Sequence, residues 1–279
     1  MKVVNIYQLL LKTYNKYIMS LYIMFIYILL LVIIYIYIRK NINYLYFQPS
    51  PKRNIDDFDN IHSKYKCLNI NGHYAIFRKR KGKGKGNRIR NIKGMVIAHG
   101  NAGSFLDRGY LIDRLDNYDG DIYLFEYPEF SGLDGKANID NCVKETLFWI
   151  NYVKLKYKKI DLFGESIGGG IIIETCYRHS IGFINTIYLQ STFTSMADVI
   201  KNLNYGLYII YNLLLLNDLN TIEHLKYIKC NNYIIIHSLE DSLINYNQAI
   251  KNHEILKKMN KNVKFIQGSG THGNTIFTI

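Results

Sequence analysis

The first sixty residues carry a hydrophobic pattern unlike that of the rest of the chain. Residues 17–38 contain no charged residue and no proline, and Ile, Leu, Tyr and Met dominate them. A helix of this length rises 1.5 Å per residue and covers about 30 Å of hydrocarbon. A cleaved signal peptide has a shorter apolar region followed by small residues, whereas this run ends in Arg39 and Lys40. The pattern predicts an uncleaved, single-pass membrane anchor, with a buried core helix as the alternative.

These boundaries divide the chain into four parts. We expect an N-terminal tail at 1–16, a transmembrane anchor at 17–38, a polar linker at 39–60 and a soluble domain at 61–279. Basic residues flank the anchor on both sides, with three lysines before it and four Lys or Arg residues within the following linker. Because that difference is small, the positive-inside rule does not choose an orientation. The sequence predicts a single-pass membrane protein and leaves open the side on which the soluble domain lies.

Short apolar runs typical of strands alternate with helical periodicity from residue 61 onwards. Two β-rich runs, 65–70 and 74–77, flank Asn71-Gly72, which favours a type I′ hairpin. Further strands are predicted at 93–98, 121–127, 160–163, 184–189, 233–237 and 263–266, and helices at 105–115, 139–157, 171–178 and 245–258. A hairpin followed by such alternation predicts an α/β fold with a mostly parallel, twisted sheet and helices on both of its faces.

The segment 192–229 interrupts this alternation. It contains an apolar stretch at 205–216. Two interpretations stay open: the segment forms a cap or lid over an active site, or the apolar stretch is simply a packed helix.

Charge and cysteine content change this picture little. The chain has a formal net charge of +13, and its densest basic tract, 78–88, predicts a flexible loop between two strands. Such a loop can contact phosphate, but Lys, Asn, Ile and Tyr are abundant throughout, as expected from an A/T-rich genome. We therefore expect no specific nucleic-acid partner, and either attraction to anionic lipid headgroups or plain solvation for this tract. The four cysteines contain no C-x-x-C pair and predict buried thiols.

The most informative motif is Gly164-Glu165-Ser166-Ile167-Gly168, between a predicted strand and a predicted helix. Strand, G-x-S-x-G and helix together form the nucleophile elbow of α/β-hydrolases, in which a tight turn exposes a serine hydroxyl above the sheet. The following helix N-terminus favours negative charge, which suits a reaction that develops an oxyanion. A plain glycine turn is the competing interpretation of the motif taken by itself.

A nucleophilic serine requires a histidine base and an acid that orients it. In this fold they follow the serine in the order acid, histidine, each in a loop after a strand. Asp241 is the favoured acid and Glu240 the alternative, while His272 lies in a glycine-rich loop after the last strand. His179, His237 and His253 fall in predicted regular elements or at their ends and lack that position.

The predicted oxyanion donors are two backbone N–H groups. One belongs to Ile167, at the start of the elbow helix, and the other to Asn101, in the loop 98–104 after a strand. Small residues in that loop let the Asn101 amide approach an oxyanion closely. The loop lacks the G-K-[ST] of a phosphate-binding loop, and no metal or cofactor is required by these residues.

Together these motifs resemble the Bem46-like group of α/β-hydrolases, which includes ABHD-type protein depalmitoylases. The resemblance rests on HGNAG at 99–103, GESIGG at 164–169, STFTS at 191–195, Asp241 and GTH at 270–272, and it extends over about residues 61–279. It implies a serine hydrolase (a serine esterase, thioesterase or lipase) with Ser166, Asp241 and His272 as its catalytic triad. Its implied substrates are acyl esters or thioesters. The predicted anchor favours a substrate at a membrane surface, such as a lipid ester or an S-acylated protein.

Two departures from the group's pattern stand out. The group usually has P-G-Y-G-x-S after its fourth strand, where this chain has PEFSGL at 128–133, so Glu129 and Ser131 occupy glycine positions. If the turn needs positive φ, we expect the loop to be shaped differently. The chain also ends seven residues after His272, so the usual closing helix is shortened or missing. These departures motivate one alternative, a non-catalytic, membrane-tethered binding protein of this fold. A peptidase is a further alternative, because related folds cleave amides.

Overall fold

The computed structural model describes residues 2–42, 46–50, 64–80, 93–214 and 219–279. They form two units, Met1–Leu45 and Tyr46–Ile279. The first unit is essentially one helix, α1 (Lys2–Asn41). Its segment Leu11–Asn41 has a mean hydropathy of 2.8 and is long and apolar enough to cross a membrane; the predicted anchor at 17–38 lies within it.

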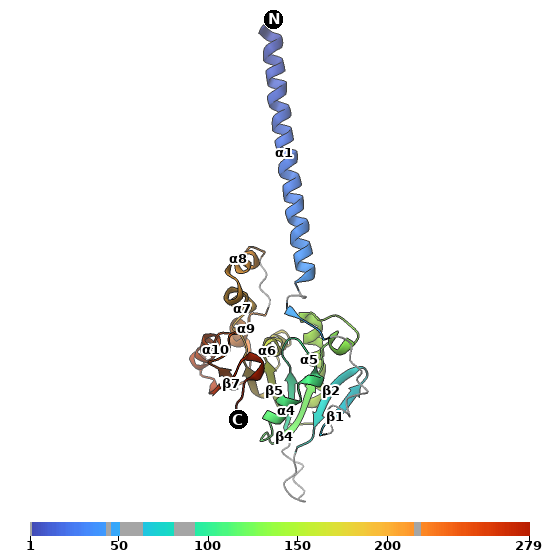
Figure 1. Cartoon of the computed structure of the whole chain (residues 1–279), viewed down its shortest axis with the longest axis vertical. Coiled ribbons are helices and arrows are strands. Elements are labelled where there is room, and N and C mark those ends of the chain that lie inside the picture. Colours follow the sequence, from blue (N-terminus) through green and yellow to red (C-terminus); the bar gives the residue numbers. More distant parts are fainter. Residues whose placement is uncertain (1, 43–45, 51–63, 81–92, 215–218) are drawn as a thin grey trace, which may run out of the picture. The chain divides into compact units, whose positions relative to one another are not determined.

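The second unit is built on one eight-stranded sheet with the order β1-β2-β4-β3-β5-β6-β7-β8 (Figure 1). The strands are β1 (Lys66–Ile70), β2 (His73–Arg78), β3 (Lys93–Ala98), β4 (Gly120–Phe125), β5 (Lys159–Glu165), β6 (Ile184–Gln190), β7 (Asn232–Ser238) and β8 (Asn262–Gly268). Strand β2 runs antiparallel to both of its neighbours, and all other neighbours are parallel. The predicted α/β class and the mostly parallel sheet are confirmed.

The predicted hairpin joins β1 to β2. Asn71 and Gly72 have φ values of 54° and 89°, the pair of left-handed conformations that a type I′ turn requires. One expectation at the other end of β2 is wrong: Arg78, predicted to begin a flexible basic loop, is buried as the last residue of the strand. Its guanidinium donates to the carbonyls of Leu115 and Tyr118. The part of the basic tract at 81–88 lies outside the described residues.

Helices cover both faces of the sheet. The helices of this unit are α4 (Gly109–Arg114), α5 (Ile139–Lys154), α6 (Ile167–Arg178), α7 (Met196–Leu203), α8 (Tyr205–Leu213), α9 (Thr221–His224) and α10 (Tyr246–Lys258), with short 3-10 turns η3 (Phe105–Asp107), η4 (Phe130–Gly132), η5 (Leu225–Tyr227) and η6 (His272–Asn274). The predicted helix at 105–115 is thus a 3-10 turn followed by a short α-helix. Residues 215 and 216 of the predicted stretch 205–216 lie outside the described part.

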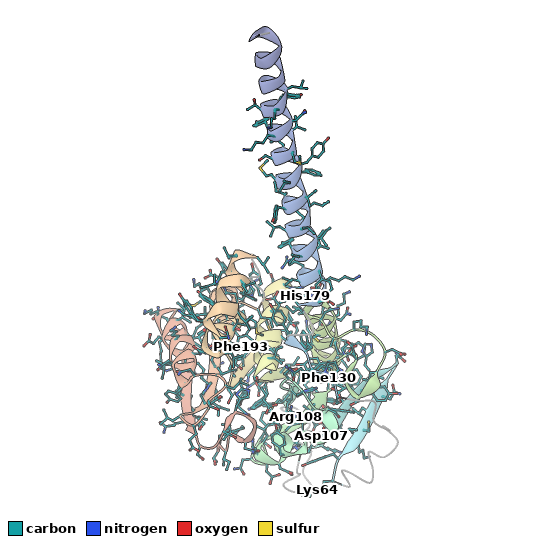
Figure 2. All side chains as sticks on the ribbon, turned by 45° about the horizontal axis from the view of Figure 1, so that its top comes forward. Lys64, Asp107, Arg108, Phe130, His179 and Phe193 are labelled. Atoms are coloured by element: carbon teal, nitrogen blue, oxygen red, sulfur yellow. The ribbon has the colours of Figure 1, made fainter. Side chains whose placement is uncertain are left out.

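Two apolar layers result from the alternation of side chains along the strands. Met95 and Ile97 of β3 face Leu111 of α4 in one buried cluster, while Tyr123 of β4 faces Trp149 of α5 on the other side. Phe130 and Phe193, labelled in Figure 2, are buried in the loops that follow the strands. The loops after β4 and β6 therefore rest on a packed interior, which holds their backbone in place.

Candidate active site

Ser166 occupies the turn between β5 and α6, with a φ of 54° and a ψ of −120°. The neighbouring glycines explain why the turn is possible. A Cβ on Gly164 would lie 2.3 Å from the Gly169 Cα, and one on Gly168 would lie 2.1 Å from the Ala98 carbonyl oxygen. Both distances are far below van der Waals contact, so only glycine permits this approach of helix, strand and loop. The G-x-S-x-G motif forms the strained strand–turn–helix expected of a nucleophile elbow.

Three residues predicted from the sequence meet at this edge of the sheet. The His272 Nε2 atom lies 2.9 Å from Ser166 Oγ, and its Nδ1 atom lies 2.8 Å from Asp241 Oδ2. Asp241 follows β7 and His272 follows β8, the neighbouring parallel strand. Parallel pairing of β5 to β8 places all three loops at one edge, which is why residues more than 100 positions apart come into contact.

The Asp241 carboxylate is held as an anion. Its side chain is fully buried, and burial works to raise the pKa of the carboxyl. Hydrogen bonds from His237, His272 and the Ile244 amide outweigh burial and hold that pKa well below its ordinary range. A second backbone amide, that of Leu243, donates to the Oδ1 atom at 3.0 Å. This carboxylate can therefore stabilise positive charge on the neighbouring imidazole.

From the sequence, His237 is excluded as the base because it lies inside a predicted strand. In the structure its Nε2 atom lies 3.2 Å from Asp241 Oδ2 and 2.8 Å from the Ile244 carbonyl oxygen. The imidazole is fully buried, so its contact with the acid is shielded from water. The signal available in the sequence was the strand-end position four residues before Asp241.

The loop 98–104 is held in place by the buried carboxylate of Glu165 and by Arg108. Gly100 N donates to Glu165 Oε2 at 2.9 Å, and the Arg108 guanidinium lies 3.4 Å from the same oxygen. Arg108 also donates to the carbonyl oxygens of Asn101 and Ala102, at 3.0 and 2.7 Å. Two carbonyls of the loop are thus turned towards one fixed cation, and the neighbouring peptide planes are fixed with them.

The two predicted oxyanion donors have N–H groups without an acceptor among the described residues. Within the described part of the chain, neither the Asn101 nor the Ile167 backbone N–H makes a hydrogen bond. Ile167 is the first residue of α6, where an N–H has no intrahelical acceptor. The Asn101 side chain is engaged elsewhere: its Oδ1 atom accepts from Gln48 N at 2.8 Å.

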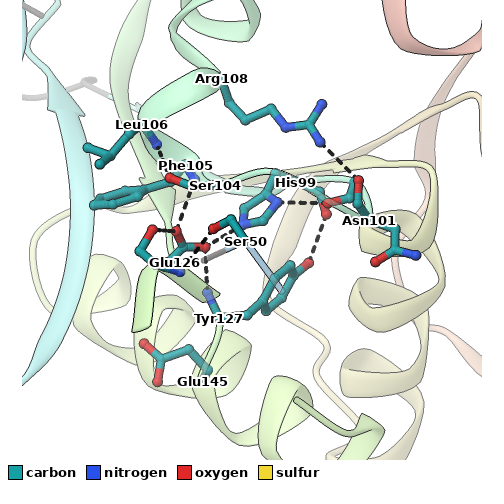
Figure 3. Close-up of polar contacts among 12 residues, drawn as sticks. Ser50, His99, Asn101, Ser104, Phe105, Leu106, Arg108, Glu126, Tyr127 and Glu145 are labelled. Carbon is teal, nitrogen blue, oxygen red and sulfur yellow. Dashed lines mark hydrogen bonds and ion pairs between the residues drawn. The ribbon is translucent and has the colours of Figure 1, made fainter. Parts of the chain in front are cut away.

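A second buried carboxylate, Glu126, joins this loop to the loop after β4 (Figure 3). Its oxygens lie 2.8 Å from His99 Nε2 and accept hydrogen bonds from the Ser131 hydroxyl at 2.6 Å and from Phe105 N at 3.0 Å. The sequence predicted Glu126 only as part of a strand at 121–127, but β4 ends at Phe125. Its role was missed because nothing in the pattern shows where the strand ends.

The loop at 128–133 has the left-handed backbone that the glycine-rich form would adopt. Glu129 has a φ of 71° and Ser131 a φ of 55°. Polar contacts accompany both: Glu129 forms an ion pair with Lys136 at 2.7 Å, and the Ser131 hydroxyl donates to Glu126. The expectation that the non-glycine residues reshape the loop is therefore wrong for these two φ angles.

Comparison with solved structures identifies the fold. The esterase Pf2001 from Pyrococcus furiosus superposes with a TM-score of 0.57 and 16% identity, over 81% of this chain and 90% of that one. Est1E from Butyrivibrio proteoclasticus gives 0.55 and 13%, over 75% and 90% of the two chains. A puromycin-hydrolyzing peptidase from Mycobacterium tuberculosis gives 0.57 and 10%, over 75% of this chain and 37% of that one. The α/β-hydrolase fold is confirmed.

Sequence comparison identifies closer relatives. No protein-family profile matches the chain. YfhR of Escherichia coli K12 is 29% identical over 119 residues, 41% of this chain and 42% of that protein. The uncharacterized protein R595 of Acanthamoeba polyphaga mimivirus is 30% identical over 207 residues, covering 67% of this chain and 70% of that protein. At this identity and coverage, the chain belongs to the family of the mimivirus protein R595, on an α/β-hydrolase fold.

Proposed function

We propose that this protein is a serine hydrolase that cleaves an ester or thioester through an acyl-enzyme. The observation that carries the proposal is the hydrogen-bonded series Ser166–His272–Asp241 at the edge of the sheet, with separations of 2.9 and 2.8 Å. Each group has the role its chemistry suits: a hydroxyl as nucleophile, an imidazole as base and a buried carboxylate that orients it.

In the acylation step His272 Nε2 takes the Ser166 proton while Oγ attacks the substrate carbonyl carbon. The carbonyl oxygen becomes an oxyanion, which accepts hydrogen bonds from the Asn101 and Ile167 amides. The imidazolium then gives its proton to the leaving alcohol or thiol as the acyl bond breaks. Water, deprotonated by the same imidazole, releases the acyl group as a carboxylic acid and restores the serine.

Asp241 contributes by holding the imidazole rather than by exchanging the proton itself. Its hydrogen bond to His272 Nδ1 fixes the tautomer in which Nε2 is free to accept from the serine, and its charge stabilises the imidazolium. The amides of Leu243 and Ile244 keep the carboxylate in place. No metal or cofactor takes part in this mechanism.

The proposed location is a membrane. The segment Leu11–Asn41 has the length and hydropathy of a membrane span, and we assign it as a single-pass anchor of a Bem46-like hydrolase. A hydrolase tethered in this way meets substrates at the bilayer surface, so a lipid ester or an S-acylated protein is the proposed substrate. The chain's likeness to a peptidase structure makes amide cleavage the competing activity.

The test is covalent labelling by a fluorophosphonate probe in the full-length protein, solubilised in mild detergent. We expect the wild type to be labelled and Ser166→Ala to be unlabelled, with His272→Gln labelled far more slowly. Ser242→Ala, which changes an exposed serine beside Asp241, is the matched control and should label like the wild type. Equal labelling of wild type and Ser166→Ala would refute the nucleophile, and labelling without turnover of any acyl ester would favour the peptidase or the binding protein.

A further inference from the structure

Helix α8 exposes an apolar surface that the described residues of the chain do not cover. Its sequence, YGLYIIYNL, has no charged residue. The large side chains exposed on it and at the end of α7 are Leu203, Tyr205, Leu207, Ile209, Ile210 and Leu213, each between 46% and 75% exposed. Of its own residues only Tyr211 is buried. A helix that is apolar all round is normally enclosed by protein or lipid, so this one requires an occupant outside the described residues.

The buried side of α8 contacts residues 46–50, the segment that follows the membrane-length helix α1. Tyr211 accepts a hydrogen bond, at 3.1 Å, from the hydroxyl of Tyr46. The neighbouring Phe47 is 2% exposed, and Gln48 N is bonded to Asn101. Residues 46–50, assigned to the linker by the sequence, therefore make defined contacts within the hydrolase unit.

Chain connectivity limits how far α8 can be from the membrane. Five peptide steps separate Tyr46 from Asn41, the last residue of α1, and each step spans at most about 3.8 Å between Cα atoms, or about 19 Å in all. This bound holds for any path of the intervening residues. If α1 spans a bilayer and Asn41 marks its end, the buried side of α8 is held within a short reach of the headgroup region.

We propose that α8, with Leu203, is an interfacial helix that lies in the headgroup region of the bilayer in which α1 is anchored. The inference rests on the membrane anchoring proposed above. Interfacial helices bury apolar side chains at the headgroup–acyl boundary, and tyrosine and lysine suit that depth because each has an apolar body and a polar end. Tyr205 and Tyr208 are two of the tyrosines of this helix. Lys201 is the neighbouring lysine, and its Nζ atom lies 5.3 Å from the Tyr208 ring centroid.

The contacts of Tyr46 and Gln48 connect α8 to the proposed active site. The same five-residue segment touches α8 through Tyr211 and the proposed oxyanion loop through Asn101. Seating α8 in the bilayer therefore fixes the height of the catalytic edge above the membrane. An ester or thioester within reach of the headgroup region, with its acyl chain still in lipid, is the substrate class that this arrangement serves.

The experiment places an environment-sensitive fluorophore on full-length protein reconstituted in phosphatidylcholine–phosphatidylserine vesicles. The half-buried Cys67 is replaced by serine, and a single cysteine is introduced as Leu207→Cys on α8 or as Leu155→Cys, a control position that is 87% exposed after α5. Apolar faces of interfacial helices are buried about 5–10 Å into the headgroup–acyl boundary, so spin-labelled lipid should quench the Leu207→Cys probe by about half and leave the Leu155→Cys probe unchanged.

Flotation of the vesicles separates the two proposals. Protein that floats with both probes unquenched overturns the interfacial helix and leaves the anchor standing. Protein that does not float overturns the anchor and the helix together. A blue shift at Leu207→Cys that grows with protein density, without quenching by lipid, shows a second copy covering α8 and also overturns the inference.

Discussion

Replacement of Ser131 tests how the loop after β4 keeps a left-handed backbone without glycine. Ser131 has a φ of 55° and a ψ of 15°, a conformation that costs an L-residue about 1–2 kcal/mol. Its hydroxyl donates to the buried Glu126 carboxylate at 2.6 Å, and a bond to a charged group is worth about 1.5–3 kcal/mol. The hydrogen bond therefore offsets the backbone strain.

The two simplest variants separate these contributions. Ser131→Ala keeps the strain and loses the bond, so we expect it to destabilise the protein by about 1.5–3 kcal/mol. Ser131→Gly loses the same bond but relieves the strain, against an entropy cost in the unfolded chain of about 0.4–1 kcal/mol. The glycine variant should therefore be the more stable of the two by about 1 kcal/mol.

Thermal unfolding of the full-length protein in detergent, followed by near-ultraviolet circular dichroism, measures the difference. For a domain of this size 1 kcal/mol corresponds to about 2–4 °C in Tm. The control pair is Ser242→Ala and Ser242→Gly, at an exposed position that does not have a positive φ. There the alanine variant should be more stable than the glycine variant. An alanine variant at 131 that melts at or above the glycine variant would refute the reasoning.

Three further outcomes follow from the site. Gly168→Ala places a Cβ 2.1 Å from the Ala98 carbonyl oxygen, so we expect little folded protein, measured as the monodisperse yield. The lowered pKa of Asp241 adds stability that is present above the ordinary value of about 3.9 and is lost as pH falls below it; Asp241→Asn should flatten that acid loss in Tm. Arg108→Lys should lower kcat on an acyl ester by up to about 100-fold, because the Asn101 amide loses its fixed position.

Each of these variants has a counterpart that separates the site from general damage. Gly273→Ala meets no atom within 4 Å and should give a normal yield. Asp134→Asn, at an exposed position near η4, should lose Tm at low pH as steeply as the wild type does. Arg114→Lys, in the last turn of α4, should keep kcat near that of the wild type. Contrary results in these controls would assign the losses to the scaffold.

The sequence predicted the sheet and the meeting point of its loops because both depend on local patterns. Asn71-Gly72 specified the hairpin through the φ angles that it tolerates, and the glycines around Ser166 specified the elbow. Once the strands were ordered, parallel pairing alone brought Asp241 and His272 to neighbouring loops. Their catalytic roles stay predictions, but their proximity required no information beyond strand order and loop position.

The supporting contacts were not predictable in the same way. His237 has the burial pattern of an ordinary strand residue, and its contact with Asp241 depends on how the chain turns after β7. Glu126 was assigned to a strand, and its bonds to His99 and Ser131 join loops that are separated in sequence. Such contacts arise from tertiary packing, which no local propensity encodes. The same limit left the segment 205–216 open between a cap and a packed helix.

Ser131 shows why the missing glycines are a poor guide to the shape of this loop. A glycine pattern indicates a left-handed backbone, but the absence of glycine does not exclude one. A favourable side-chain hydrogen bond can offset the strain of that conformation in another residue. Here the compensating hydrogen bond goes to Glu126, whose other oxygen contacts His99 in the loop 98–104. A single buried carboxylate thus links the shape of the loop after β4 to the position of the loop 98–104. Changes at 129 and 131 in relatives of this chain should therefore be read together with the residue at 126.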